Sequence, residues 1–237
     1  HVRSRRQRQM CIRDRDLLLD ALDSKVEISE DLVVLPGMVA DSLAHASPWE
    51  NIHDKLLIDA TSPVEGDPRY LRAPLGGCPD SLEVSASGID GIVQARMLRS
   101  SMLVVTTDIE GGPSPSENVE TDDEDGARMQ REKICSIRDS IWNLEGADNL
   151  RWLFITDSDV DLSKDSWKRI LLWQFFCRFD VGRDLHFDSD RRRVCWDATA
   201  PIPSQEGPLP VRRWPGVTLH DPEVLARVDT WLQEGGF

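Results

Sequence analysis

The pattern of apolar and polar residues is clearest between residues 152 and 179. Residues 152–155 are four consecutive apolar residues with polar neighbours, which is typical of a strand covered on both faces of a parallel sheet. Three aspartates follow at alternate positions, Asp157, Asp159 and Asp161. The apolar run at 167–179 then predicts a helix that is apolar on most sides and lies in the interior or under a partner subunit.

The other elements follow from shorter patterns. The most regular helix carries Ile134, Ile137, Ile141 and Leu144 on one face, and Gly146 stops it. Pro36-Gly37 is expected to close the first strand, and residues 62–80 are expected to form a loop. We expect further helices at 16–23, 38–45, 89–97 and 222–232, and further strands at 32–35, 55–61, 102–106, 185–187 and 194–196. This alternation predicts an α/β fold with a mostly parallel or mixed sheet covered by helices.

Charge is distributed unevenly along the 237 residues. Residues 1–15 carry six arginines and one acidic residue, whereas the rest has 22 basic and 41 acidic side chains, a net charge of −19 (22 minus 41). A basic arm for nucleic acid is one interpretation of the first 15 residues. Residues 6–15 also resemble translated sequencing-adapter sequence, so we treat 1–15 as a non-native or disordered tail and expect the chain to be the C-terminal part of a longer protein. The acidity of the rest argues against nucleic acid and anionic membranes as partners.

Residues 110–126 form the most polar segment, with seven acidic residues, two prolines, three glycines and no basic residue. Such a segment buries too little apolar surface to offset the entropy of ordering it. We therefore expect a disordered acidic insertion, with calcium binding as the functional alternative.

Cysteine usage and hydropathy indicate the compartment. The five cysteines, Cys11, Cys78, Cys135, Cys177 and Cys195, form no C-x-x-C pair, which indicates reduced thiols in a cytoplasmic protein. No apolar run approaches the roughly 18 residues of a membrane span, so we expect no integral membrane segment.

The aspartates after the central strand are the first candidates for chemistry. An EF-hand loop starting at Asp157 would need glycine and glutamate where Leu162 and Lys168 stand, so that site is excluded. A strand followed by Asp-x-Asp also occurs in haloacid-dehalogenase-like phosphatases and in metal-dependent glycosyltransferases. A metal-dependent phosphatase or glycosyltransferase that uses Asp157 and Asp159 is therefore one functional hypothesis.

Other polar residues give weaker signals. His45 lies near Ser47 and His53 near Asp59, but the sharp serine turn and oxyanion hole of a nucleophilic triad are not recognisable. Basic and acidic side chains alternate in residues 178–184, which favours an ion-pair network at a helix end. Its members would be Arg178, Asp180, Arg183 and Asp184. Residues 57–63 and 195–201 both run from apolar residues into Asp-Ala-Thr-x-Pro, which two similar strand terminations would explain.

Six segments between 157 and 224 occur in the order found in the C-terminal region of the UbiD family, the prenylated-flavin-dependent decarboxylases, and the chain resembles that family through them. They are Asp157-Ser158-Asp159-Val160, the helix with Trp167 and Trp173, residues 178–184, Asp197-Ala198-Thr199, Trp214-Pro215, and Asp221-Pro222-Glu223-Val224. Residues 43–48 and the first Asp-Ala-Thr at 59–61 resemble the menaquinone-biosynthesis branch. Residues 64–150 match nothing we recognise in the family.

The resemblance implies that residues 16–237 form a C-terminal α/β domain of an enzyme that decarboxylates an aromatic or unsaturated carboxylic acid without oxidation. Prenylated FMN, a divalent metal and a glutamate–arginine–glutamate trio would lie in a preceding flavin domain. No segment here matches those motifs, so no catalytic, cofactor-binding or metal-binding residue is carried over. We expect the chain alone to bind neither flavin nor metal and to be inactive.

The resemblance also implies partners, namely the preceding flavin domain and a second copy of the chain. The last helix begins at Asp221-Pro222 and is followed by Gly235-Gly236. Its apolar stripe predicts an oligomer or domain-docking element, with packing on its own sheet as the alternative; the stripe consists of Val224, Leu225, Val228, Trp231 and Leu232. Asp157 and Asp159 are expected to be structural and to orient the turn after the strand.

Overall fold

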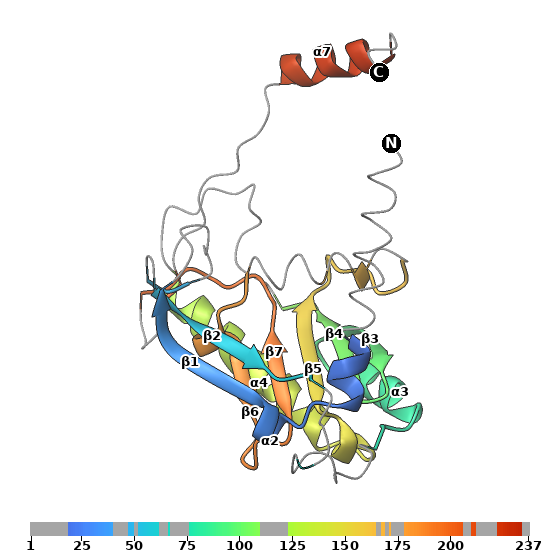
Figure 1. Cartoon of the computed structure of the whole chain (residues 1–237). Coiled ribbons are helices and arrows are strands. Elements are labelled where there is room, and N and C mark those ends of the chain that lie inside the picture. Colours follow the sequence, from blue (N-terminus) through green and yellow to red (C-terminus); the bar gives the residue numbers. More distant parts are fainter. Residues whose placement is uncertain are drawn as a thin grey trace.

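The computed structural model has an α/β fold with two sheets (Figure 1). It describes residues 19–39, 47–49, 52–61, 66, 76–109, 123–164, 167–168, 171, 178–205, 210–211 and 222–233. The larger sheet has five strands in the order β3-β4-β5-β7-β6. Their bounds are β3 Ile92–Arg99, β4 Met102–Thr107, β5 Trp152–Asp157, β6 Leu185–Phe187 and β7 Val194–Asp197. The sheet is mixed, as predicted, because β4, β5 and β7 run parallel while β3 and β6 pair antiparallel at its two edges.

A two-stranded sheet and several helices cover the large sheet. The small sheet pairs β1 (Leu32–Val39) with β2 (Ile52–Ile58), and it lies across one face of the large sheet (Figure 1). The opposite face carries α4 (Glu124–Trp142) and α3 (Ser81–Ser87). Shorter elements are α2 (Ile28–Asp31), the 3-10 helix η2 (Ala147–Asn149) and α6 (Val181–Asp184), and the last helix is α7 (Pro222–Gln233).

Strand β5 separates two hydrophobic cores, because its side chains alternate between the faces of the sheet. Trp152 and Phe154 pack in the core under the small sheet, with Trp196 of β7 at ring-centroid distances of 6.0 and 5.8 Å. Leu153 and Ile155 are fully buried in the core under α3 and α4. The prediction of a strand covered on both faces is confirmed.

Helix α4 confirms the apolar stripe found in the sequence. Ile134, Ile137 and Ile141 are at most 2% exposed and face the sheet. The helix starts earlier than expected, because the Asp123 side chain accepts a hydrogen bond from the Gly126 amide and caps it. Residues 123–126, expected to belong to a disordered insertion, therefore form the cap and the first turn of α4, and residues 110–122 lie outside the described residues.

Two predicted elements were wrong. Residues 89–97 were expected to be helical, but they form a turn and most of β3. The β-branched Ile92 and Val93 favour a strand, and Gly91, with φ of 83°, turns the chain into pairing with β4. The first strand was expected to end at Leu35, but β1 continues through Pro36-Gly37 to Val39 because a bulge there accommodates the proline and a Gly37 φ of 63°.

Several predictions fall wholly or partly outside the described residues. They concern the tail at 1–15, the continuation of the 38–45 helix beyond Val39, and most of the 167–179 helix. Within that last run Trp167, Lys168, Leu171 and Arg178 are helical. None of the described helices is long and apolar enough to cross a membrane.

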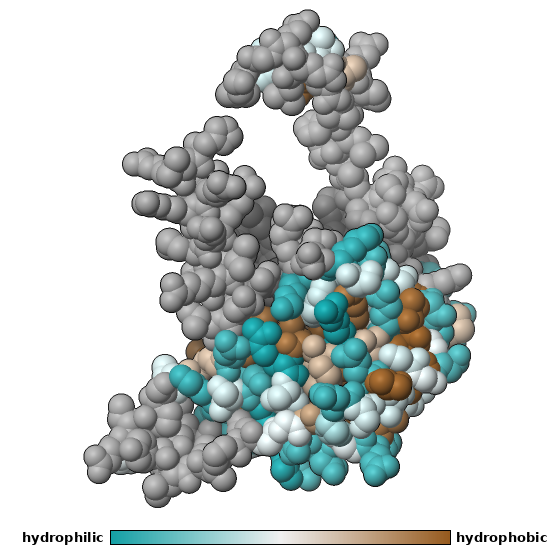
Figure 2. Space-filling view, turned by 90° about the vertical axis from the view of Figure 1, so that its right-hand side faces the viewer, coloured by the Kyte–Doolittle hydropathy of each residue, from teal (hydrophilic) through white to brown (hydrophobic). Residues whose placement is uncertain are grey.

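The β3 edge of the large sheet presents apolar residues among polar ones (Figure 2). Val93 of β3 is 51% exposed and Val84 of the neighbouring α3 is 76% exposed. Two register shifts interrupt the pairing of β3 with β4, and such irregularities discourage edge-to-edge association.

Candidate functional site

The candidate site lies where β5 and β7 end side by side. These parallel strands pair from Trp152↔Val194 to Ile155↔Asp197, and the Ala198 amide donates to the Ile155 carbonyl at 2.8 Å. The Asp157 carboxylate and the 197–200 turn therefore share the carboxyl edge of the sheet, where α/β proteins collect their chemistry.

Asp157 holds this edge together. Its Oδ2 accepts hydrogen bonds from Arg178 Nη1 at 2.6 Å and from the Ala200 amide at 2.8 Å. Its Oδ1 is buried without a hydrogen-bond partner among the described residues. Burial raises the pKa of Asp157, although the Ala200 amide and the Arg178 guanidinium both oppose the rise. The partners of Asp157 are thus residues 21 and 43 positions away.

The amino-terminal half of α4 positions the turn that reaches Asp157. Gln130 Nε2 donates to the Ala200 carbonyl at 2.8 Å, and Gln130 Oε1 accepts from the Ile202 amide at 3.1 Å. Gln130 is only 6% exposed. Its role had no signal in the sequence, because a glutamine within a helical stripe does not reveal a partner 70 residues away.

The Asp-Ala-Thr echo found in the sequence corresponds to one repeated turn. Asp197 Oδ1 accepts from the Thr199 amide at 3.0 Å and from its hydroxyl at 2.7 Å. Asp59 Oδ1 accepts from the Thr61 amide and hydroxyl at 3.0 and 2.6 Å. Asp161 and Ser163 repeat the geometry at 3.0 and 2.6 Å. The shared motif is therefore a local Asp-x-Thr/Ser turn, as two similar strand terminations would give.

Helix α6 brings a second arginine to the same edge. Arg183 binds Asp184 through two hydrogen bonds of 2.6 and 2.7 Å, and its Nη2 also donates to the Arg178 carbonyl at 3.0 Å. Asp180 caps α6 by accepting from the Gly182 and Arg183 amides. The ion-pair network predicted from residues 178–184 is confirmed, and it extends to Asp157.

The acid–base properties of this edge follow from its burial. Burial raises the pKa of Asp197 to about 7, and the Asp184 carboxylate adds to the rise, while Thr199 and Arg183 reduce it. Burial also raises the pKa of Asp180 against the pull of Arg183. Burial alone would lower the pKa of Arg183, but the Asp184 carboxylate outweighs it and the pKa is raised. Perturbed carboxyl groups at a strand edge make this cluster the strongest candidate site of the described residues.

The geometry does not favour a metal centre on Asp157 and Asp159. Asp159 is 54% exposed and lies 3.5 Å from Arg178 Nη2, so both carboxylates face a guanidinium. Asp161 turns to Ser163, whose hydroxyl holds the pKa of Asp161 well below its usual range. No group of three His, Cys, Asp or Glu residues in the described ranges is arranged to hold a metal ion.

The predicted histidine and serine candidates do not meet in a site. Ser47 is 2% exposed, and its hydroxyl donates to the carbonyls of Trp49 and Ile52. His53 lies in β2 opposite Met38. His45 lies outside the described residues.

The carboxyl edge also does not suit a flavin. Prenylated FMN carries a phosphate, which needs cationic or amide donors. Both arginines here are already engaged by carboxylates, and the surplus of acidic groups would repel a dianion. The described residues of this edge therefore do not fit the cofactor.

Comparison with solved structures gives low-identity similarities to UbiD-class enzymes. The open form of vanillic acid decarboxylase from Sedimentibacter hydroxybenzoicus is 12% identical with a TM-score of 0.38, over 65% of this chain and 32% of that chain. The closed form is 14% identical with a TM-score of 0.37, over 65% and 31%. An evolved dimeric form of HmfF from Pelotomaculum thermopropionicum, in complex with prFMN, is 12% identical with a TM-score of 0.33, over 61% and 28%. The chain thus spans about a third of the length of these proteins. No family model matches it.

Proposed function

We propose that this chain acts as the C-terminal α/β domain of a UbiD-type decarboxylase, which removes CO₂ without oxidation from an aromatic or unsaturated carboxylic acid. The flavin, the metal and the catalytic residues belong to a flavin domain outside this chain. The segment at 43–48 favours the menaquinone-biosynthesis branch, and the cysteines without a C-x-x-C pair favour a cytoplasmic enzyme. The role of this chain is to support that domain and to contribute to assembly.

One observation carries the proposal. Three of the six segments that resemble the family converge at one edge of the sheet, although they are up to 43 residues apart in the sequence. Asp157 begins the first segment, Arg178 begins the third, and Ala200 directly follows the fourth, and all three are joined through the Asp157 carboxylate. The contact joins three of the segments that carry the resemblance, so it supports treating them as one structural unit.

The proposal is tested with two proteins, the 237-residue chain and its extension by the coding sequence upstream of Asp16. We expect the extension to encode a flavin domain and, with prenylated FMN and a divalent metal, to release CO₂ from aromatic or unsaturated acids. The 237-residue chain should show no flavin absorbance after reconstitution and no CO₂ release. Tight flavin binding by the shorter chain, or an upstream sequence without a flavin domain, would contradict the proposal.

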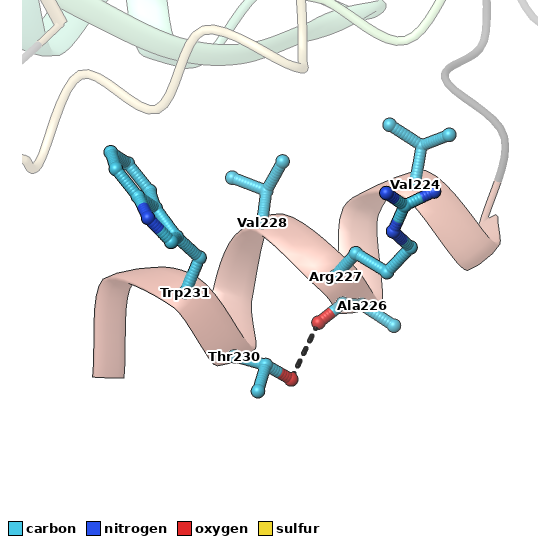
Figure 3. Close-up of a pocket in the computed structure, with 6 residues that line it drawn as sticks. All are labelled: Val224, Ala226, Arg227, Val228, Thr230 and Trp231. Atoms are coloured by element: carbon cyan, nitrogen blue, oxygen red, sulfur yellow. Dashed lines mark hydrogen bonds between the residues drawn. The ribbon is translucent and has the colours of Figure 1, made fainter. Parts of the chain in front are cut away.

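Helix α7 is the proposed assembly element. It lies apart from the two sheets in Figure 1, and its Val224, Val228 and Trp231 project from one side of the helix in Figure 3. These three side chains are 44–49% exposed, so the structure does not bury them on their own sheet. Burying such side chains is worth roughly 1.5–3 kcal/mol each. A second copy or the flavin domain would supply the cover.

A pair of matched variants in the extended protein tests α7. Trp231→Glu should reduce the oligomer mass measured by size-exclusion chromatography with light scattering, as should truncation after His220. Thr230→Glu is the control, because Thr230 lies on another side of α7 and bonds to the Ala226 carbonyl (Figure 3). An unchanged oligomer with a merely lower melting temperature would assign α7 to its own domain.

A further inference from the structure

Two parts of this chain share more than an Asp-Ala-Thr turn. Helices α2 and α6 are each a single turn that leads directly into a strand. The Glu27 amide donates to Asp31 Oδ2 at 2.9 Å, and the Asp180 amide donates to Asp184 Oδ2 at 2.8 Å. In each turn the amide of the aspartate, Asp31 or Asp184, also donates to the carbonyl of Glu27 or Asp180 at 2.8 Å. The chain therefore enters β1 and β6 through the same hydrogen bonds.

The strands after these turns pair in the same register. Leu32, the first residue of β1, pairs with Ile58, and Leu185, the first residue of β6, pairs with Trp196. Ile58 and Trp196 each stand directly before an Asp-Ala-Thr segment. In both places a helical turn, an antiparallel strand pair and an Asp-Ala-Thr turn therefore follow one another in the same order.

This order distinguishes the repeat from the Asp turn alone, which residues 161–163 form as well. We call the described residues of 27–61 the first hairpin unit and residues 180–199 the second hairpin unit. The two hairpin units pack on one hydrophobic core from opposite sides (Figure 1). Alternate residues of both contribute to it, namely Leu32, Val34, Leu56, Ile58, Leu185, Phe187, Val194 and Trp196.

The outer faces of the two hairpin units differ in their cover. In the second hairpin unit, Cys195 points away from the shared core and is fully buried in the core under α3 and α4. The corresponding residue of the first hairpin unit is Leu57, which is 55% exposed. Val33, the residue that pairs with Leu57, is 43% exposed. The first hairpin unit thus presents an apolar outer face where the second has a helical layer.

The edges of the two hairpin units differ in a parallel way. In the second hairpin unit, β7 lies between β6 and β5, and the Val194 amide donates to the Arg151 carbonyl, next to β5, at 2.8 Å. In the first hairpin unit, β2 pairs with β1 alone, within the part of the chain that the structure describes. Leu56 and Ile58 of β2 are partly exposed, whereas their counterparts Val194 and Trp196 are buried.

The amides of Leu56 and Ile58 point to this unpaired edge. In an antiparallel pair, the amides of successive residues point alternately toward the partner strand and away from it. The Asp59 amide donates to the Asp31 carbonyl at 2.9 Å, so the Ile58 and Leu56 amides face away from β1. They correspond to the Val194 amide and its neighbours, which face β5. The edge of β2 therefore offers the donors of a parallel ladder.

We propose that the polypeptide preceding Asp16 adds a parallel strand to the edge of β2 and a helix to the outer face of the first hairpin unit, as β5 and α4 do for the second. The proposal rests on the proposed function in one respect, namely that this chain is the C-terminal part of a longer protein. Strand β5 ends 23 residues before Asp180 (180 minus 157). The same spacing before Glu27 falls at residue 4 (27 minus 23), within the 1–15 tail that we propose to be non-native.

The coding sequence upstream of Asp16 gives the first test. It should contain at least about four consecutive apolar residues within about 30 residues of Asp16, preceded by a helix with an apolar stripe. A flavin domain that reaches Asp16 without such a run would overturn this inference and leave the proposed function standing. The run and helix without a flavin domain would support the inference and overturn the proposed function.

Hydrogen exchange in the extended protein and in the 237-residue chain tests the edge of β2. The amides of Leu56 and Ile58 should exchange at least about 10-fold more slowly in the extended protein, because the added strand accepts their hydrogen bonds. The Leu57 amide faces β1 in both proteins and is the internal control, so its rate should change less. Equal slowing of all three amides, or of none, would overturn the proposal. Protection of Leu56 and Ile58 that grows with the concentration of the 237-residue chain would also overturn it, because a second copy would then occupy the edge.

Leu57→Lys in both proteins tests the outer face. In the 237-residue chain, where Leu57 is 55% exposed, we expect the melting temperature to fall by no more than about 2 °C. In the extended protein the added helix covers Leu57, so the same change should lower the melting temperature by at least about 5 °C. Val93→Lys is the matched control, because Val93 is 51% exposed on the edge strand β3, and its effect should be equally small in both proteins. Equal effects of Leu57→Lys in the two proteins would overturn the proposal.

Discussion

The two ends of the large sheet hold their poorly exposed arginines in different ways. At the amino end, Arg151 donates to the carbonyls of Gly76 and Asp23 and lies 3.8 Å from one carboxylate, Asp23. Asp23 Oδ1 in turn accepts from the Ser101 amide at 2.8 Å. At the carboxyl end, Arg178 and Arg183 share their surroundings with four carboxylates.

The contacts at the amino end join segments of the chain, whereas the carboxyl groups at the carboxyl end can change their charge. At the amino end, one carboxylate and neutral carbonyl groups surround the cation Arg151. It ties the 19–24 helix and the 76–78 segment to the start of β5. The carboxyl end has surplus acid and a carboxyl group with a pKa of about 7, so protons and charged partners can alter it.

We expect the largest loss in the free energy of unfolding when Arg151, at the amino end of the large sheet, is replaced. Arg151 is 7% exposed, and Arg151→Met would leave the Gly76 and Asp23 carbonyls without their guanidinium donor and the Asp23 carboxylate without its cation. Removing one partner of a buried ion pair costs about 3–5 kcal/mol. Urea denaturation at pH 7 measures this loss in the free energy of unfolding.

The control for this change is an arginine–aspartate ion pair on the surface. Arg128 is 58% exposed and lies 2.7 Å from Asp125 one turn away on α4. Arg128→Met should change the free energy of unfolding by no more than about 0.5 kcal/mol. If the two variants lose the same free energy of unfolding, the contacts of Arg151 do not stabilise the amino end of the sheet.

A smaller and pH-dependent loss is expected at the carboxyl end. Arg178→Met removes the 2.6 Å bond to Asp157, and hydrogen bonds to charged groups contribute about 1.5–3 kcal/mol. Without the guanidinium, the pKa of Asp157 rises further above its ordinary value, since burial already raises it. A protonated Asp157 no longer needs a cation, so the loss should shrink as the pH falls from 7 to 4.

The Arg151 variant provides the comparison for that pH dependence. Its loss should change less over the same range, because the acceptors left behind include neutral carbonyl groups. Parallel urea titrations at pH 4, 5, 6 and 7 test both variants. A loss for Arg178→Met that grows toward acid would refute the role given to Asp157.

The sequence predicted local features of this molecule well and its long-range contacts poorly. The buried strand at 152–157 and the stripe of Ile134, Ile137 and Ile141 follow from the periodicity of burial, which each element carries in its own residues. The Asp-Ala-Thr turns were also recognisable, since their bonds span two residues.

The features that the sequence did not predict depend on contacts between distant segments of the chain. Residues 92–97 form a strand because β4 pairs with them, and this neighbour outweighs a weak helical pattern. A structural role was expected for Asp157 in the turn after its own strand, but the sequence did not predict its bond to the Ala200 amide, in the turn after the neighbouring strand β7. Gln130 of α4 holds Ala200 in place through a hydrogen bond to its carbonyl. Such contacts depend on which strands become neighbours, and a single sequence does not state that order.

A loss of about 1 kcal/mol in the free energy of unfolding is expected at the copy of the repeated turn that follows β2. Asp59→Ala removes the bonds to the Thr61 amide and hydroxyl, which resembles the loss of a helix cap. The loss in the free energy of unfolding should not vary between pH 6 and pH 8. A marked variation of the loss over this pH range would contradict the prediction.

The smallest effect is expected at Asp159, and it decides between the two functional hypotheses. Asp159 is 54% exposed and lies 3.5 Å from Arg178, and such exposed pairs contribute about 0–1 kcal/mol. Asp159→Ala should therefore change stability by less than about 0.5 kcal/mol and leave turnover of the extended enzyme within about twofold of the wild type. A metal-dependent phosphatase or glycosyltransferase would instead need this carboxylate to hold its cation, so the same change would abolish activity without lowering the melting temperature. Asp159→Ala is expected to disturb folding very little, so a loss of folding could not explain a fully stable but inactive variant. Such a variant would show that Asp157 and Asp159 take part in the chemistry of this protein.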